Sequence, residues 1–362
     1  MTNPADVRTG RWLRIAGLAG FIACCTWPLL LQRGGDRAGS PGWLPAKETA
    51  FHEVRLLALG DVNLGRRVGQ VILKGDTLYP FARVAGTLRD YDVVFANLES
   101  NISDQKGRTE SPRSNMIFTA PPAAAQALKR AGVRVVATAN NHALDFGVSA
   151  RDQTIRYLDS AGIAHCGTTE EGANPYRPAF VTSHGIRFAF FAVTDIMNGP
   201  GTSWKRFVAA ADTSGLLPAI RAVRESTDVV VVSFHGGVEY APESSARTRE
   251  FAREALAGGA DIVLGHHPHI PYGVYAEGGK WAVHSLGNFV FMQPDRYWTR
   301  FSFAISFDIL RDATGTRIRS LRALPLRAGF QPEFLPPGEE AETVRERIRL
   351  LSSQSVQEYI QW

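Results

Sequence analysis

The sequence predicts an α/β protein in which mixed β-sheets form layers flanked by helices. Short apolar runs, several of them nearly continuous, alternate with amphipathic helical patterns along the chain. Such runs are typical of strands buried on both faces, and their alternation with helices is typical of a layered α/β fold. From residue 272 onward the pattern changes to a hairpin and period-two strands, so the sheets are expected to be mixed.

The predicted elements follow one another from residue 54 to residue 353. The apolar strand candidates are 54–59, 92–96, 133–138, 186–193, 228–233 and 261–265. The helical patterns between them are 121–131, 148–161, 213–225 and 244–257. A hairpin turning at Gly278-Gly279, an alternating strand over 301–310 and a helix over 339–353 complete the order. In that last helix Val344, Ile348 and Leu351 share one face, which predicts docking on the sheets.

Residues 1–31 are predicted to be a signal anchor. Arg11 and Arg14 precede an uncharged apolar run from Ile15 to Leu31, which would span about 25 Å as a helix. No small-x-small cleavage site follows this run, which favours an uncleaved anchor over a signal peptide. The positive-inside rule keeps the arginines cytoplasmic. We therefore expect a single-pass protein of the cell membrane whose main domain is extracytoplasmic.

The rest of the sequence predicts a linker, one large domain and a tail. Residues 32–53 are rich in Gly and Pro and predict a flexible linker, 54–335 the main domain, and 336–362 a C-terminal helix and tail. The chain is 44% hydrophobic and 21% charged, an ordinary globular balance. Its net charge is +5, but no Lys/Arg run lies beyond residue 31, so nucleic acid is not an expected partner.

Polar clusters recur directly after the predicted strands. They are Asp61 and Asn63; Asn97 and Glu99; Asn141, His142 and Asp145; His235 and Glu239; His266, His267 and His269; His284 and Asn288. Because loops beyond the carboxyl ends of strands converge in α/β sheets, these clusters are expected to meet in one crevice. Imidazole and carboxylate suit divalent metals such as Mn, Zn or Fe. The number of candidate ligands exceeds the needs of one ion and predicts two, with Glu99 as the bridging carboxylate.

Each of these residues also has a purely structural interpretation. An isolated histidine is more often a hydrogen-bonded or surface residue than a ligand, and His165 is interpreted in that way. Asp145 is expected to start or cap the helix at 148 rather than to bind metal. For Asn97, capping of the loop backbone and a functional role are equally favoured interpretations. The recurrence of polar clusters after five or six strands favours a metal site over these alternatives.

In their order, the motifs resemble the CapA family, named for bacterial poly-γ-glutamate capsule synthesis, within the calcineurin-like metallophosphoesterase superfamily. The matching segments are GDVNLGR (60–66), ANLES (96–100), ANNHALDFG (139–147), FHGGVEY (234–240), GHHPH (265–269) and SLGNFVF (285–291). The resemblance implies the calcineurin-like fold, with layered mixed sheets, over the main domain. It also implies a catalytic position for His142, which would stand beside the substrate as a proton donor or oxyanion stabiliser.

The resemblance further implies the ligands of two divalent ions. Asp61 would bind the first ion, Glu99 would bridge, and Asn141 with His235 would bind the second. Asn63 stands where the superfamily carries a ligating histidine, and an amide oxygen is a poorer ligand for Zn than imidazole. His266 or His284 would orient the metal ligands without binding an ion. The implied metal ligands are Asp61, Asn63, Glu99, Asn141, His235, His267 and His269.

The function implied is that of a membrane-anchored extracytoplasmic CapA-like protein in biosynthesis or export of a poly-γ-glutamate-type capsule polymer. Its expected partners are the anionic polymer or its precursor and subunits of a polymer synthase. Three activities stay open: a two-metal hydrolase, a non-catalytic accessory or binding subunit of the synthase complex, and a metal-dependent phosphoesterase. Asn63 and Glu99 replace the His and Asp of the superfamily, which disfavours ordinary phosphodiester hydrolysis.

Overall fold

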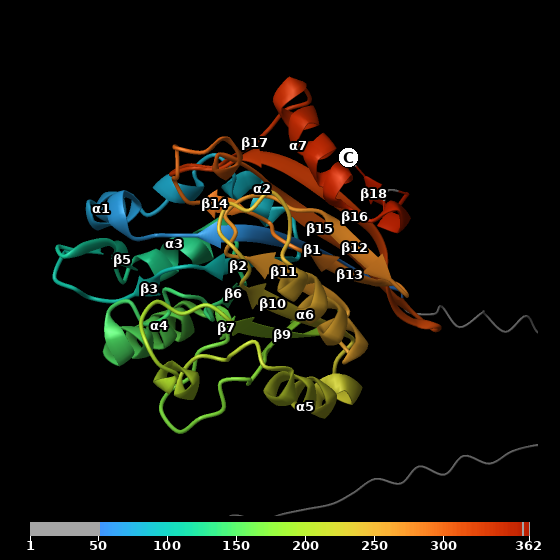
Figure 1. Ribbon diagram of the computed structural model, residues 1–362, viewed down its shortest axis with the longest axis horizontal. Helices are drawn as coiled ribbons and strands as arrows, with labels where there is room; N and C mark the ends of the chain where they lie inside the picture. The colour runs from blue at the N-terminus through green and yellow to red at the C-terminus, as the bar shows by residue number, and fades with distance from the viewer. Residues whose placement is uncertain (1–50, 357, 362) are drawn as a thin grey trace, which may run out of the picture. The chain divides into compact units, whose positions relative to one another are not determined.

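Two β-sheets packed face to face, with helices on the outer face of each, form the body of the protein (Figure 1). The computed structural model describes residues 51–356 and 358–361. The predicted anchor, 1–31, and nearly all of the predicted linker lie outside the described residues. Within the described ranges, none of the helices has the length and apolar character that crossing a membrane requires.

The first sheet has nine strands and combines parallel and antiparallel pairs. Its parallel half consists of β1 (His52–Val62), β2 (Val93–Leu98), β6 (Val135–Ala137), β7 (Ala164–Cys166) and the short β14 (Asn288–Val290) beside β1. Its antiparallel half consists of β15 (Phe301–Asp312), β16 (Gly315–Arg327) and β17 (Glu333–Phe334), with β18 (Ile360–Gln361) parallel to β16. The expected mixture of strand directions is confirmed.

The second sheet has six strands in the order β12-β13-β11-β10-β9-β8. Parallel pairing joins β9 (Ile186–Thr194), β10 (Val229–His235), β11 (Ile262–His266) and β13 (Lys280–Val283). Antiparallel strands β8 (Ala179–Ser183) and β12 (Val274–Glu277) close the two edges. The predicted hairpin at Gly278-Gly279 is present between β12 and β13, and both glycines have the positive φ values, 58° and 77°, that a tight hairpin turn needs.

Apolar side chains from the facing surfaces of the two sheets form the central core. Phe95 of the first sheet stacks on Phe190 of the second, with ring centroids 5.7 Å apart. Helices α1 (Arg66–Leu73), α2 (Ala85–Arg89), α3 (Ala124–Ala131) and α4 (Gly147–Ala161) cover the outer face of the first sheet. Helices α5 (Thr213–Val223) and α6 (Ala246–Ala257) cover the second. In α7 (Glu339–Leu351), Val344 and Ile348 pack into the central core, as predicted for a docked helix.

The chain between β2 and α3 forms a small third sheet that the sequence patterns do not reveal. Its strands are β3 (Asn101–Ile102), β4 (Glu110–Ser111) and β5 (Ser114–Ala120). Short 3-10 turns occur at Tyr79–Phe81, Ser203–Arg206, Arg224–Ser226, Tyr297–Thr299 and Gln354–Val356. Helices α1 and α2 were also not predicted. All these elements are short, so each carries too few apolar residues to define a period.

Candidate metal centre

Side chains from the carboxyl ends of strands in both large sheets meet at one end of the sandwich. Asp61 lies near the end of β1, Glu99 directly after β2, and His235 is the last residue of β10. His267 and His269 follow β11, and all five side chains are buried. The convergence expected from the sequence is therefore present, because parallel strands of the two packed sheets end on the same side.

Two groups of potential ligands share one carboxylate. Asp61, Glu99 and His269 form the first group, and Glu99, His235 and His267 form the second; within each, the ligand atoms lie within 4.8 Å of one another. Glu99 Oε1 lies 3.7 Å from His235 Nε2 and 3.9 Å from His269 Nε2. Glu99 thus occupies the position that a bridging carboxylate would take between two ions.

Several polar atoms of these groups have no hydrogen-bond partner among the residues that the structure describes. They include both carboxylate oxygens of Glu99, Oδ2 of Asp61 and Nδ1 of His267. Leaving a buried carboxylate or imidazole unpaired is costly, so native proteins rarely do it without an ion or another partner. A divalent cation bound by these atoms would satisfy them, and the donor set of carboxylates and imidazoles fits such an ion.

The electrostatics of the site also favour a bound cation. Burial, reinforced by the nearby charge of Asp61, raises the pKa of Glu99 well above its ordinary value. Burial pushes the pKa of Asp61 upward, but His266 at 3.2 Å and His269 at 3.3 Å outweigh it and hold that pKa well below normal. Burial lowers the pKa of His235 well below its usual range and that of His267 to about 4. Both imidazoles are therefore neutral at pH 7, the form that binds metals.

Asparagine side chains hold the candidate ligands in place. Asn97 Nδ2 donates to Asp61 Oδ1 at 2.8 Å and lies 3.2 Å from His235 Nδ1, so this residue supports the centre rather than capping a loop. Asn288 Oδ1 lies 2.9 Å from His269 Nδ1. Contacts of this kind orient imidazoles for metal binding and are part of such sites.

The two asparagines predicted as ligands differ in their surroundings. Asn141 Oδ1 lies 2.8 Å from His235 Nε2, beside the second group. Asn63 Oδ1 accepts a hydrogen bond of 2.8 Å from the backbone N–H of Gly65. That bond forms the turn leading into α1. Both residues stay predicted ligands, and Asn63 has a structural role in addition.

His142 lies at the edge of the centre and is held by an acidic partner. Its Nδ1 is 2.8 Å from Asp145 Oδ2, and its Nε2 is 3.9 Å from Glu99 Oε1. Asp145 Oδ2 also accepts from the backbone N–H of Phe118 at 2.9 Å, and the Phe118 ring stacks on His142 with centroids 4.1 Å apart. The expectation that Asp145 starts or caps α4 was wrong, because the N-cap is Phe146, which has no side-chain cap. The His-x-x-Asp spacing was the available signal for this pair.

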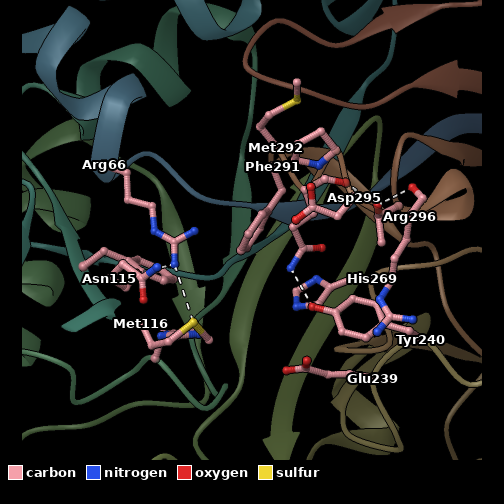
Figure 2. Close-up of a pocket in the computed structure, with 15 residues that line it drawn as sticks. Arg66, Asn115, Met116, Glu239, Tyr240, His269, Phe291, Met292, Asp295 and Arg296 are labelled. Carbon is pink, nitrogen blue, oxygen red and sulfur yellow. Dashed lines mark hydrogen bonds between the residues drawn. The ribbon is translucent and has the colours of Figure 1, made fainter.

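A cavity of about 250 Å³ opens above the centre (Figure 2). His142 and His269 line it, together with Phe118 and Tyr240. Glu239, which the sequence placed in a polar cluster without a role, also lines it. The sequence did not single out Phe118 or Arg296 as site residues, since chain segments outside the motifs contribute them, and it assigned no role to Tyr240, the last residue of the FHGGVEY motif.

The backbone around the cavity is strained at four non-glycine residues. Arg66, Tyr240, His267 and His269 have φ values of 48°, 59°, 95° and 60°. Positive φ costs such residues about 1–3 kcal/mol each and persists only where the surrounding structure fixes it, often at functional sites. This clustering supports a functional assignment for the cavity.

The two histidines proposed as supports behave differently. His266 is fully buried and its Nδ1 lies 3.2 Å from Asp61 Oδ1, so it supports that carboxylate. His284 belongs to neither ligand group, and its Nδ1 lies 3.2 Å from Ser244 Oγ. Burial, reinforced by Arg249 and Arg253, lowers the pKa of His284 to about 4.

We expect His284 to make folding stability depend on pH. The folded pKa is about 4, below the ordinary 6.5, so the stabilisation is present above pH 6.5 and is lost as pH falls toward 4. The full shift corresponds to at most about 3 kcal/mol. Urea unfolding at pH 7 and pH 4.5, with metal supplied, should show that the wild type loses more stability on acidification than His284→Gln. Equal losses in both proteins would contradict this account.

Together, the layered sheets and the shared carboxylate define an α/β protein with a candidate dinuclear metal centre at the carboxyl ends of its strands. The chain belongs to the family described as bacterial capsule synthesis protein PGA_cap, whose model matches residues 55–293. This range contains all the residues of the candidate centre.

Curated relatives carry names from capsule polymer synthesis. The chain is 29% identical over 265 residues to the capsule biosynthesis protein CapA of Bacillus anthracis, covering 71% of this chain and 63% of the relative, less than two thirds of its length. It is 30% identical over 272 residues to the PGA biosynthesis protein CapA of Bacillus subtilis, covering 71% and 68%. A probable polyglutamine synthesis accessory protein of Mycobacterium tuberculosis is 28% identical over 351 residues, covering 90% and 89%.

Solved structures show a more distant likeness. A hypothetical protein from Thermus thermophilus aligns with a TM-score of 0.43 and 17% identity, covering 78% of this chain and 98% of that one. A putative 5'-nucleotidase from Staphylococcus aureus aligns with a TM-score of 0.44 and 11% identity, covering 82% and 58%.

Proposed function

We propose that this protein is a membrane-anchored extracytoplasmic hydrolase that uses two divalent ions to cut an amide or ester bond in a capsule polymer of the poly-γ-glutamate type. The buried Glu99, shared by two ligand groups and without a hydrogen-bond partner among the described residues, is the observation that carries the proposal. Membership of the capsule synthesis family and the names of the relatives support the choice of polymer.

In this proposal Asp61, Glu99 and His269 would hold the first ion, with Asn63 as a further predicted ligand. Glu99, His235 and His267 would hold the second, with Asn141 beside them. Bound divalent ions polarise a carbonyl group and lower the pKa of water, which is the chemistry that hydrolysis of an amide or ester needs.

Among the residues that the structure describes, His142 is the best placed to move a proton. Asp145 holds its Nδ1 at 2.8 Å, so Nε2 is left to face Glu99 and the cavity. A histidine fixed in this way donates a proton to a leaving group or a hydrogen bond to a developing oxyanion. Stacking on Phe118 restricts the ring further.

The location of the protein is part of the proposal. Arg11 and Arg14, followed by the uncharged run Ile15–Leu31, support a single membrane anchor with the main domain outside the cytoplasm. Such a placement would bring the metal centre to the compartment in which a capsule polymer is assembled or attached.

A non-catalytic accessory role in a polymer synthase complex is the second candidate. The name of the Mycobacterium tuberculosis relative, a probable accessory protein, favours it. The engagement of Asn63 Oδ1 by the Gly65 N–H favours it as well, because this amide would be a weak ligand for the first ion.

Incubation of the full-length chain and Mn²⁺ with poly-γ-glutamate tests the proposal. Mass spectrometry is expected to detect γ-glutamyl fragments with the wild type and none with His142→Ala. Metal binding without fragment release would favour the accessory role. Turnover of an aryl phosphodiester without γ-glutamyl release would instead identify a phosphoesterase.

A further inference from the structure

A second cavity, which we call the arginine cavity, adjoins the cavity over the metal centre. It has a volume of about 1060 Å³ and shares Arg66 and Asn115 with its neighbour. Arg67, Arg108 and Arg113 line it as well, against a single acidic residue, Glu110, so the ionisable lining side chains carry a net charge of +3. Such a concentration of one charge repels itself unless an anion binds there.

Two of the arginines that line this cavity have no acidic partner among the described residues to neutralise them. Arg108 and Arg113 are exposed and form no ion pair with any residue in 51–356 or 358–361. In contrast, Arg224 pairs with Asp261 at 2.6 Å. Free guanidinium groups present a fork of donors that matches carboxylate oxygens in a bidentate arrangement.

Arg66 lies at the junction of the two cavities in a fixed position. Its guanidinium carbon stacks 4.4 Å above the Phe118 ring, which in turn stacks on His142. Its Nε is buried and has no hydrogen-bond partner among the described residues. Its backbone N–H donates to Thr109 O at 2.9 Å, which ties α1 to the loop that carries Arg108. Its Nη2 donates to the backbone oxygen of Asn115, so this cation is held beside the candidate catalytic histidine, where it lines both cavities.

The opposite wall of the metal-centre cavity repeats this arrangement. Arg296 stacks 4.4 Å over Tyr240, whose ring stacks on His269 at 5.9 Å (Figure 2). Glu239 and Asp295 also line this cavity, so its two arginines are balanced by two acids. Of these two cavities, the arginine cavity is the one with an excess of positive charge, so an anionic substrate is expected to bind there on one side of the metal centre.

We propose that the arginine cavity binds successive carboxylates of an extended polyanion, which passes Arg66 to reach the metal centre. The inference rests on the proposed function for the identity of the chain as a polycarboxylate. A γ-linked glutamate chain carries one carboxylate on every residue, so several can contact Arg67, Arg108 and Arg113 at once. The site consequently favours long chains over short ones.

Fluorescence anisotropy in EDTA tests this inference without any turnover. The probes are fluorescein-labelled long poly-γ-glutamate and a labelled γ-glutamyl dipeptide. For the double variant Arg108→Glu/Arg113→Glu we expect about tenfold or greater weakening of long-chain binding and a shallower salt dependence. The control Arg156→Glu/Arg221→Glu, which changes two exposed arginines that line neither cavity, is expected to bind like the wild type.

Three results would overturn the inference. They are long-chain binding that the cavity variant leaves unchanged, equal weakening in the control variant, and equal affinity for the dipeptide and the long chain. Tighter, Arg108- and Arg113-dependent binding of a polyphosphate of similar length would overturn the assignment to carboxylates. Metal-dependent release of γ-glutamyl fragments together with unchanged binding in the cavity variant would refute this inference alone and leave the proposed function standing.

Discussion

Replacing His235 with alanine is expected to lower Mn²⁺ affinity at one of two sites by about 100-fold or more. Loss of a residue that only hydrogen-bonds to a metal ligand already costs about 10–100-fold in affinity, and loss of a ligand itself should cost at least as much. His235 Nε2 faces Glu99 Oε1 at 3.7 Å, and the residue is fully buried. Both carboxylate oxygens of Glu99 and Nδ1 of His267 lack a hydrogen-bond partner among the described residues. Its loss leaves Glu99 and His267 as the remaining members of the second group. Isothermal titration calorimetry of the full-length chain measures both the stoichiometry and the affinity.

His165→Ala is the matched control for this prediction. His165 is paired with Asp159 at 3.1 Å and belongs to neither ligand group. Its replacement is expected to preserve two Mn²⁺ equivalents. Thermal unfolding of both variants shows whether a loss of metal affinity comes from the missing imidazole or from destabilisation of the fold. Two equivalents of undiminished affinity in His235→Ala would show that this imidazole binds no ion.

Replacing Gly60 with alanine is expected to destabilise the fold by about 3 kcal/mol or more. A Cβ at this position would lie 2.0 Å from the backbone oxygen of Gly287 and 2.9 Å from its carbonyl carbon. Relief of this overlap needs movement of backbone, because no flexible side chain can give way. The same contact region contains the hydrogen bond of 2.9 Å from Asp61 N to Gly287 O, so metal affinity should fall together with stability.

Gly86→Ala provides the matched control for the backbone change. A Cβ at Gly86 would have no other atom within 4 Å, and the residue lies in α2. Alanine is the better helix former, so this variant is expected to be unchanged or stabilised by up to about 1 kcal/mol. Urea unfolding compares the two proteins. Equal stability of the two variants would contradict the close packing of β1 against the loop before β14.

The sequence predicted the buried strands well because apolar runs of this length have few alternatives. The six predicted strands are present, and the strand predicted over 228–233 continues to His235, because the polar Ser233 interrupts the apolar run before the strand ends. The arrangement as two sheets packed face to face was not predicted in detail. Strand order depends on contacts between distant segments, such as Phe95 with Phe190, which no local pattern encodes.

The sequence also predicted which polar side chains gather, since strand ends on one side of a sheet converge. It did not predict the surroundings of those side chains. Phe118 and Arg296 reach the cavity from the small third sheet and from the loop after β14, and neither lies in a recognisable motif. Asp145 was misinterpreted because a carboxylate just before a helix is usually a cap, whereas here it contacts His142.

Anomalous X-ray scattering from crystals of the protein grown with Mn²⁺ tests the central claim most directly. The account predicts two peaks, one among Asp61, Glu99 and His269 and the other among Glu99, His235 and His267, with Glu99 contacting both. A single peak, or peaks that do not contact Glu99, would contradict the dinuclear centre.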